Sequence, residues 1–295
     1  MSQERRALDG VAFSLMVLLA ASWGFQQVTI KVIVPEVSLV MQAAIRSALA
    51  AALLLAWARW RGVALFGRDG TLAAGIGAGL LFGGEFVFIY GGLAYTNASR
   101  MMVFIYLTPA LTALGLHFFV RGERLALRQW IGVGVAFAGL VLAFAEGLHA
   151  DRSTLLGDLC GMIAALLWSA TTVLIRATRL AQAGVAKTLW YQLAVSTPVL
   201  FLFSFVLNEP GVVRLSALSV ASLLYQGVIV AFLSYLAWFW LLTRYYAARL
   251  SVLSFLAPMF GVLFGVVLLG EPLRGAFAAA AALVAAGIVL VNLRR

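Results

Sequence analysis

The chain has 295 residues, of which 64% are hydrophobic and only 11% carry a charge. A soluble globular protein keeps about a quarter of its residues charged, so this composition argues against that class and indicates a protein of the lipid bilayer. The net charge of +10 comes from basic residues that stand singly or in pairs between apolar runs, so we expect no nucleic-acid partner. The single cysteine, Cys160, excludes an intrachain disulfide bond.

Ten apolar segments are long enough to cross the hydrocarbon core, which takes about 20 helical residues. In chain order they are 10–34, 38–60, 71–93, 98–120, 128–148, 155–177, 187–208, 216–242, 248–269 and 273–293. They lack the alternation of a barrel strand, and backbone polar groups in lipid must be paired within the segment, so each is expected to be a helix. The sequence therefore predicts an all-α membrane protein of ten transmembrane helices with short loops.

Two parts of the chain resemble each other. An arginine stands nine positions before a proline at Arg100 and Pro109, and again at Arg249 and Pro258. Both apolar runs that contain these prolines end in a Gly-Glu pair. Such self-similarity indicates an internal duplication.

A second motif recurs upstream of the first. Trp23 and Trp168 are each followed, seven and eight positions on, by an isoleucine and a basic residue. Because both motifs recur in the same order, we interpret the chain as two five-helix repeats, residues 1–150 and 151–295. Five is an odd number, so the second repeat enters the membrane in the opposite sense. Inverted-topology repeats are typical of secondary transporters that bind substrate near the midplane, between the two halves.

Lysine and arginine residues gather on one side of the predicted spans. That side includes Arg5, Arg59, Arg121, Arg249 and Arg294. Loops rich in these residues stay in the cytoplasm, so we expect both termini to be cytoplasmic.

Three ionisable side chains, Lys31, Arg46 and Glu85, lie well inside predicted spans. Each costs about 2.5–3.5 kcal/mol if it stays unpaired at the centre of a membrane helix. With a rise of about 1.5 Å per residue, Arg46 and Glu85 reach a similar depth. Two interpretations stay open: the two residues form a structural ion pair, or they face a substrate.

Other polar and aromatic residues fall in or near the same layer. The candidate substrate-binding residues are Trp23, Gln26, Gln27, Arg46, Glu85, Tyr106, Trp168, Tyr225, Gln226 and Trp238. A layer shared by several helices favours a water-lined cavity, with plain packing of the tryptophans as the alternative. Aromatic faces suit apolar groups and ammonium ions. Glu85 suits an amino group or a proton, and Arg46 or the glutamines suit a carboxylate.

Two further residue types bear on helix geometry. Pro109 and Pro258 should loosen their helices about one turn before the proline, which makes them candidate hinge or gating residues, with a tolerated kink as the alternative. Gly75, Gly79 and Gly83 recur every four residues, which predicts a tight contact between helices.

The sequence carries no enzymatic constellation. It has two histidines, no Cys/His cluster and no phosphate-binding glycine loop, so we expect neither an enzyme nor an ATP-driven pump, and no cofactor or metal. A membrane-bound enzyme, one alternative, would need clustered acids, for which only Glu146, Asp151 and Asp158 are available. A structural membrane subunit, another alternative, would not need a polar layer at the midplane.

The most specific motifs accompany the tryptophans and prolines of the two repeats. They are the Trp23-Gly24…Lys31 start, the Pro109 span closed by Gly122-Glu123, and its copy at Pro258 closed by Gly270-Glu271-Pro272. With ten spans in two inverted halves, the chain resembles the drug/metabolite transporter superfamily, in its EamA-like branch, over nearly its whole length. The first copy departs from the second in having Arg124 where the second has Pro272. Glu85 and the Tyr106-Leu-x-Pro109 run are similar to the YddG-type aromatic amino-acid exporters.

This resemblance implies a secondary transporter that exports amino acids, with aromatic and other apolar ones favoured, across the bacterial inner (plasma) membrane. It implies alternating access around a midplane cavity, with the fifth and tenth spans peripheral and the other eight around the cavity. The expected partners are a small-molecule substrate and the lipid bilayer, and the protein is expected to be a monomer or homodimer. Export of another small metabolite or of a drug-like cation is the alternative, and Arg46 argues mildly against a cation.

Overall fold

The computed structural model describes residues 8–92, 95, 101, 104–120, 122–144, 154–270 and 277–292. Within these ranges the regular secondary structure is entirely helical. Seven helical segments there are long and apolar enough to cross a membrane, and two shorter apolar helices accompany them. The all-helical membrane fold is therefore confirmed. The count of ten spans stays a prediction, because part of the fourth predicted span, including Arg100, lies outside the described residues, as do Glu271 and Pro272.

The helix bounds follow the predicted spans closely. The elements are α1 Gly10–Ile33, α2 Leu39–Trp60, α3 Leu72–Gly92, α5 Thr108–Phe119, α6 Leu127–Phe144, α7 Thr154–Ala177, η2 Arg179–Ala181, α8 Val185–Val206, α9 Ala217–Leu224, η3 Tyr225–Ser234, α10 Tyr235–Arg244, α11 Ala247–Leu253, α12 Leu256–Leu269 and α13 Phe277–Asn292. Polar side chains begin two of them. Asp9 accepts a hydrogen bond from the backbone N–H of Ala12 (2.9 Å) at the start of α1. Ser216 accepts one from the backbone N–H of Ser219 (3.2 Å) at the start of α9.

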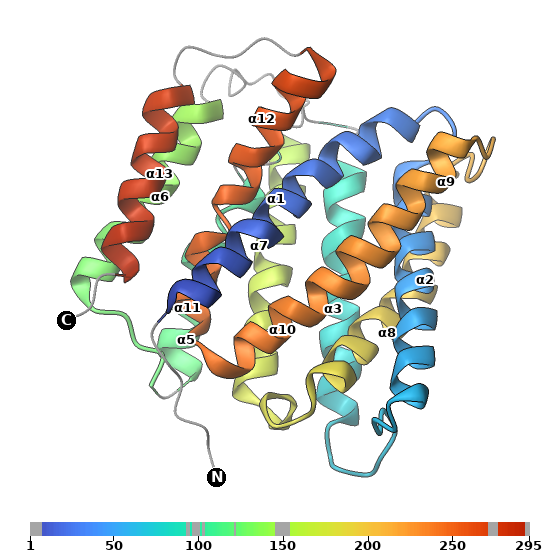
Figure 1. The fold of residues 1–295 in the computed structure, drawn as a ribbon, viewed down its shortest axis with the longest axis horizontal. Helices are drawn as coiled ribbons and strands as arrows, with labels where there is room; N and C mark the ends of the chain where they lie inside the picture. The colour runs from blue at the N-terminus through green and yellow to red at the C-terminus, as the bar shows by residue number, and fades with distance from the viewer. Residues whose placement is uncertain are drawn as a thin grey trace.

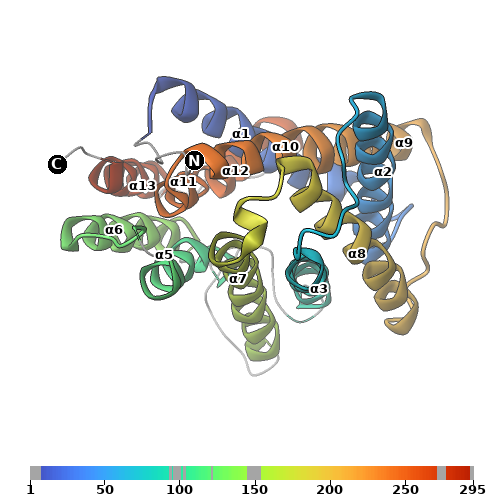
Figure 2. The same cartoon turned by 90° about the horizontal axis from the view of Figure 1, so that it is seen from below.

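The helices stand side by side along the longest axis of the molecule, some nearly upright and others oblique (Figure 1). The most extensive helix contacts each join a helix of residues 1–150 to one of residues 151–295: α6 with α13, α3 with α7 and α8, α1 with α12, and α2 with α8. Figures 1 and 2 show α6 and α13 side by side at one edge of the bundle. The peripheral position implied for the fifth and tenth spans is therefore found.

Glycines bring α3 close to α8, as their spacing predicts. A Cβ atom added at Gly79 would lie 2.5 Å from Cβ of Val195, and one at Gly83 would lie 3.2 Å from Cγ1 of Val199. A Cβ atom at Gly75 would collide with the ring of Tyr191. The absence of side chains on this face of α3 lets the two backbones approach closely.

Both prolines stand just after a break in their helix. A turn at Tyr106 and Leu107 precedes α5, which holds Pro109 in its first turn. A turn at residues 254–255 precedes α12, which holds Pro258 in its first turn. Proline is tolerated there because the first-turn N–H groups have no partner within the helix. The expected loosening before each proline is confirmed, while a hinge role stays a prediction.

The predicted span 216–242 is helical without interruption from α9 to α10, but it is not one regular α-helix. Its middle, η3, is a π-helix of ten residues between α9 and α10. A π-helix pairs residues five apart, is rare, and often occurs at functional sites. Hydrophobic periodicity gave no sign of this change, which redirects the side chains of η3.

Candidate functional site

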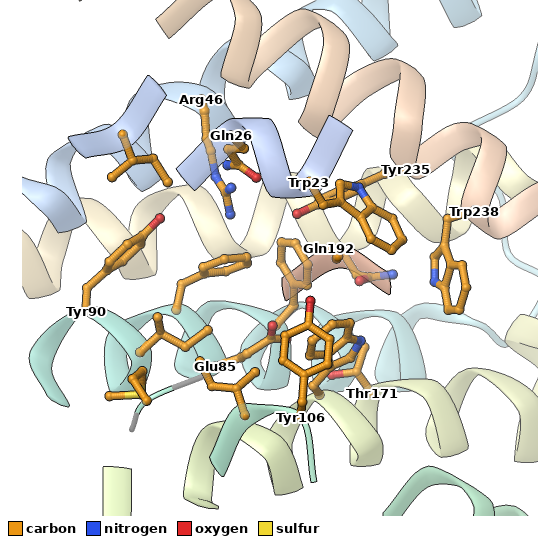
Figure 3. A pocket seen from close by; sticks show the side chains of 18 of the residues that line it. Trp23, Gln26, Arg46, Glu85, Tyr90, Tyr106, Thr171, Gln192, Tyr235 and Trp238 are labelled. Atoms are coloured by element: carbon orange, nitrogen blue, oxygen red, sulfur yellow. The ribbon is translucent and has the colours of Figure 1, made fainter. Parts of the chain in front are cut away.

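A cavity of about 340 Å³ lies inside the bundle (Figure 3). Its volume is within the range of about 300–1,000 Å³ that is typical of sites for small molecules. The residues lining it include Trp23, Gln26 and Ile30 on α1, Arg46 on α2, Phe82, Glu85, Phe86, Ile89 and Tyr90 on α3, Ile105 and Tyr106 before α5, Trp168, Thr171, Thr172 and Ile175 on α7, Gln192 on α8, and Tyr235, Trp238 and Phe239 on α10. The spacing of three or four residues on α1, α3 and α7 places each set on one face of its helix. Both halves of the chain contribute to the wall.

Two ionisable side chains of opposite type, Arg46 and Glu85, line this cavity. Arg46 is 1% exposed and Glu85 is 5% exposed. Atoms Nε and Nη2 of Arg46 and Oε2 of Glu85 have no hydrogen-bond partner in the part of the chain that the structure describes. No ion pair joins the two residues there. The guanidinium carbon of Arg46 instead lies 4.1 Å from the ring centroid of Phe86, where cation–π attraction stabilises it. The structural ion pair considered from the sequence is therefore not found.

Aromatic rings from both halves meet in the same cavity. The rings of Trp23 and Trp238 lie 5.9 Å apart at 75°, and those of Tyr106 and Trp168 lie 6.1 Å apart at 73°. The indole N–H of Trp23 donates to Oγ of Ser234 (2.9 Å), which fixes the orientation of that ring. Edge-to-face pairs of this kind favour rigid apolar walls.

Seven of the ten side chains expected at the site are brought together. They are Trp23, Gln26, Arg46, Glu85, Tyr106, Trp168 and Trp238. The side chain of Gln27 lies outside the described part of the structure.

The structure places Tyr225 and Gln226 away from the cavity wall, which corrects their expected position. The hydroxyl of Tyr225 donates to the carbonyl oxygen of Ser22 (3.2 Å). Nε2 of Gln226 donates to Oε1 of Gln42 (3.0 Å), and the residue is fully buried. Both residues begin the π-helix η3, which packs against α1 and α2 at this level.

The lining also includes five uncharged side chains with a polar group that were not among the candidates: Tyr90, Thr171, Thr172, Gln192 and Tyr235. Gln192 carries a usable signal, because it is a polar residue inside the apolar span 187–208, as Gln26 is in its own span. Tyr235 lies three residues before Trp238 and so shares its helix face. Lys31 also lines the cavity, with an exposed side chain near the end of α1.

A network of polar bonds lies at the end of the bundle where α1 begins and α10 ends (Figure 1). Arg176 donates to the carboxylate of Glu123 and to the backbone carbonyls of Leu242 and Tyr245. The hydroxyl of Tyr245 donates to Oδ2 of Asp9 (2.7 Å). These bonds tie α1, the α5–α6 connection, α7 and the α10–α11 connection together just below the cavity.

At the other end the cavity reaches the last turns of α1 and the first turn of α2, where Lys31, Val34 and Leu39 line it. Lys31 and Val34 are exposed. Polar bonds therefore join the helices at one end of the cavity, while exposed residues line it at the other.

The described residues include no group of three or more histidine, cysteine or acidic side chains placed to hold a metal ion. The candidate site thus consists of two opposite charges, several amides and hydroxyls, and a wall of aromatic rings. Such a site can bind and orient a small amphiphilic molecule.

An all-helical membrane bundle around a polar cavity defines a membrane transport protein, and comparison with known proteins gives its family. The model of the EamA-like transporter family matches residues 11–145 and again residues 155–293. The chain therefore belongs to the EamA-like transporter family, within the drug/metabolite transporter superfamily.

Relatives and a solved structure are similar over nearly the full length. A probable amino-acid metabolite efflux pump of Salmonella typhimurium is 27% identical over 94% of this chain and 93% of its own length. A protein of Escherichia coli with the same description is 25% identical over 96% of this chain and 94% of its own length. An uncharacterized transporter of Archaeoglobus fulgidus is 29% identical over 87% of this chain and 89% of its own length. A crystal structure of another protein matches with a TM-score of 0.80 and 23% identity, covering 96% of this chain and 98% of that one, which shows the shared fold.

Proposed function

We propose that this protein is a secondary transporter that exports amino acids, aromatic and other apolar ones above all, across the bacterial inner membrane by alternating access. The observation that carries the proposal is the presence of unpaired polar atoms of both Arg46 and Glu85 in one cavity. Buried polar atoms of opposite character that lack partners favour a ligand that carries both complements, because each is costly to leave unsolvated.

A zwitterionic amino acid supplies those complements. Its carboxylate suits the free N–H groups of Arg46, with the amide of Gln26 on the neighbouring helix. Its ammonium group suits Glu85 and the nearby ring of Tyr106. Its side chain then extends along the paired rings of Trp23 and Trp238. A simple cation would leave Arg46 unpaired, and a simple anion would leave Glu85 unpaired.

The printed descriptions of two relatives support this class of substrate, since both are called probable amino-acid metabolite efflux pumps. At 25–27% identity they do not specify which amino acid is carried. The aromatic wall favours amino acids with large apolar side chains.

Alternating access is proposed from the symmetry of the contacts. The family model matches once in each of the proposed repeats, residues 1–150 and 151–295. Let α1, α2 and α3 of the first repeat correspond to α7, α8 and the α9–η3–α10 segment of the second. The contact between α1 and α12 then corresponds to the contact between α7 and α5. The contact between α3 and α8 corresponds to the contact between η3 and α2. Inverted repeats of this kind permit two related arrangements around one site.

The proposed orientation has both termini in the cytoplasm. The described part of α1 begins, and that of α13 ends, at the same end of the bundle (Figure 1). Basic residues such as Arg59, Lys187 and Arg244 stand in helix turns at this end. In this orientation the Arg176–Glu123 network closes the cytoplasmic side. The breaks before Pro109 and Pro258 are the proposed hinges, and the protein is proposed to act as a monomer or homodimer.

Thermal unfolding of the purified protein with a panel of ligands tests the substrate class. The panel contains aromatic and aliphatic amino acids, their decarboxylated amines, their N-acetyl derivatives and quaternary ammonium compounds. We expect a rise in Tm with intact amino acids and none with the amines or the acetylated acids, because a ligand that binds only the folded state stabilises it, and more so the tighter it binds. A rise with quaternary ammonium compounds alone would instead identify a transporter of drug-like cations.

A further inference from the structure

Gln192 is a buried amide that the zwitterion described above does not use. It stands in the middle of α8, is 1% exposed and lines the cavity. Its Nε2 atom has no hydrogen-bond partner among the described residues. An unpaired amide in a membrane interior is unfavourable, so a ligand or water must complete its bonds.

Two other buried glutamines, Gln42 and Gln226, differ from Gln192. Nε2 of Gln42 donates to the carbonyl oxygen of Val37 (2.9 Å), and Nε2 of Gln226 donates to Gln42 (3.0 Å). Those two side chains hold helices together. Gln192 points into the cavity without such a partner, which is the arrangement expected of a ligand-binding amide rather than a structural one.

The position of Gln192 separates it from the charged part of the site. Figure 3 shows Gln192 well apart from Arg46, on the side of the cavity toward Trp238. The ring of Trp238 is paired with that of Trp23. An amino acid held at Arg46 and Glu85 therefore directs its side chain toward the part of the cavity that contains Gln192.

We propose that Gln192 determines specificity by hydrogen bonding to a polar group at the far end of an aromatic side chain. A phenol hydroxyl fits this description, because it can accept a bond from Nε2 while its ring lies against the tryptophans. The protein accordingly prefers tyrosine to phenylalanine, which has the same shape but leaves the amide unpaired. This inference rests on the proposed function, because it takes the substrate to be an amino acid.

Competition in counterflow tests the inference. Vesicles containing the purified protein are loaded with unlabelled amino acid, and entry of the labelled amino acid is measured against added tyrosine or phenylalanine. In the unmodified protein, tyrosine is expected to compete roughly tenfold better, the effect of one buried hydrogen bond. Gln192→Met keeps the length of the side chain but removes the hydrogen bond. In this variant phenylalanine should still compete, and the ratio of competition by tyrosine to competition by phenylalanine is expected to fall to about one.

Gln226→Met provides the matched control, because it removes a buried glutamine that lies off the cavity. It is expected to change the amount of folded protein and to leave the ratio of tyrosine to phenylalanine unchanged. Gln192→Asn keeps an amide but withdraws it by one methylene, and is expected to retain part of the preference. It replaces the methionine variant if that variant fails to fold.

The outcomes separate this inference from the proposed function. Equal competition by tyrosine and phenylalanine in the unmodified protein overturns the role of Gln192 and leaves amino-acid transport standing. A folded Gln192→Met protein that still prefers tyrosine to phenylalanine would also overturn the role of Gln192 and leave amino-acid transport standing. If no amino acid shows counterflow, the proposed function itself fails, and the inference fails with it.

Discussion

At the scale of single residues, Arg46 is the side chain whose burial most needs an explanation. It is among the largest fully buried side chains, and its contact with Phe86 leaves Nε and Nη2 unpaired within the described structure. Arg46 has a side-chain hydrogen bond with Tyr235, so only part of its guanidinium group is left for a ligand. A role in binding explains why the remaining N–H groups are buried without partners.

Replacing Arg46 separates binding from stability. We expect Arg46→Gln to abolish the rise in Tm caused by amino acids, while the Tm of the free protein stays the same or increases, because a buried charge whose N–H groups are incompletely paired is removed. Arg244→Gln serves as the control, since Arg244 is exposed and stacks on Trp240 at 4.7 Å. A large fall in the Tm of free Arg46→Gln would show that Arg46 is structural.

Asp69 gives a prediction about pH. Lys187 Nζ lies 2.7 Å from Oδ2 of Asp69, and the hydroxyl of Thr71 donates to Oδ1 (2.6 Å). These hydrogen bonds hold the pKa of Asp69 well below its ordinary value. Because the pKa is depressed in the folded state, the ion pair stabilises the fold above the unfolded-state pKa of about 3.9, and that contribution is lost progressively as the pH falls below it.

The Asp69 side chain is 46% exposed, so the effect should be small. We expect Asp69→Asn to lower the Tm slightly at pH 7 and to narrow that difference as the pH is lowered toward 3. Thermal unfolding of both proteins between pH 3 and 7 measures it. Parallel Tm curves over the whole range would mean that the pair does not contribute.

At the scale of helices, the close approach of α3 and α8 depends on glycine. We expect Gly79→Ala to destabilise the protein by about 1–3 kcal/mol, the range for overpacking a tight contact, because the new Cβ atom would lie 2.5 Å from Val195. Gly91→Ala is the matched control in the same helix, since no atom lies within 4 Å of an added Cβ there. It should be neutral or slightly stabilising, as alanine favours helix. Equal unfolding midpoints for the two variants would contradict the packing account.

The Arg176–Glu123 network makes a prediction about the closed end. If these bonds hold the cytoplasmic side shut, Arg176→Gln should open it, while Arg176→Lys should keep it partly closed. A cysteine at Ile175, a cavity residue beside the network, reports the change in a Cys160→Ser background. We expect a membrane-impermeant thiol reagent on the cytoplasmic side to label it several-fold faster in Arg176→Gln. Identical labelling rates would show that the network does not hold the gate.

The positions of the helices could be predicted because long apolar runs mark them in the sequence. The depth of the ionisable residues within these helices could be predicted as well. The span 38–60 corresponds to α2 at Leu39–Trp60, and the depth of Arg46 and Glu85 followed from the helical rise. The positions of Tyr225 and Gln226 were not predictable, because the π-helix redirects them and depends on tertiary packing.

At the scale of the whole molecule, contacts between the two halves hold the bundle together. The pair α6 and α13 lies at one edge of the bundle (Figure 2), and the described residues that line the cavity come from α1, α2, α3, α7, α8, α10 and α12 and from the segment before α5. In the alternating access proposed above, the matching contacts of the two halves exchange closure at one end for closure at the other without unfolding either half. This exchange would carry a bound molecule across the membrane.

The most direct test of the central claim is counterflow of a radiolabelled amino acid, with and without a pH gradient, in vesicles that contain only this protein. We expect labelled amino acid to accumulate transiently in vesicles loaded with the unlabelled compound, and to do so much more slowly in Glu85→Gln. Absence of counterflow for every amino acid tested, or unchanged flux and pH dependence in Glu85→Gln, would contradict an amino-acid transporter built around this cavity.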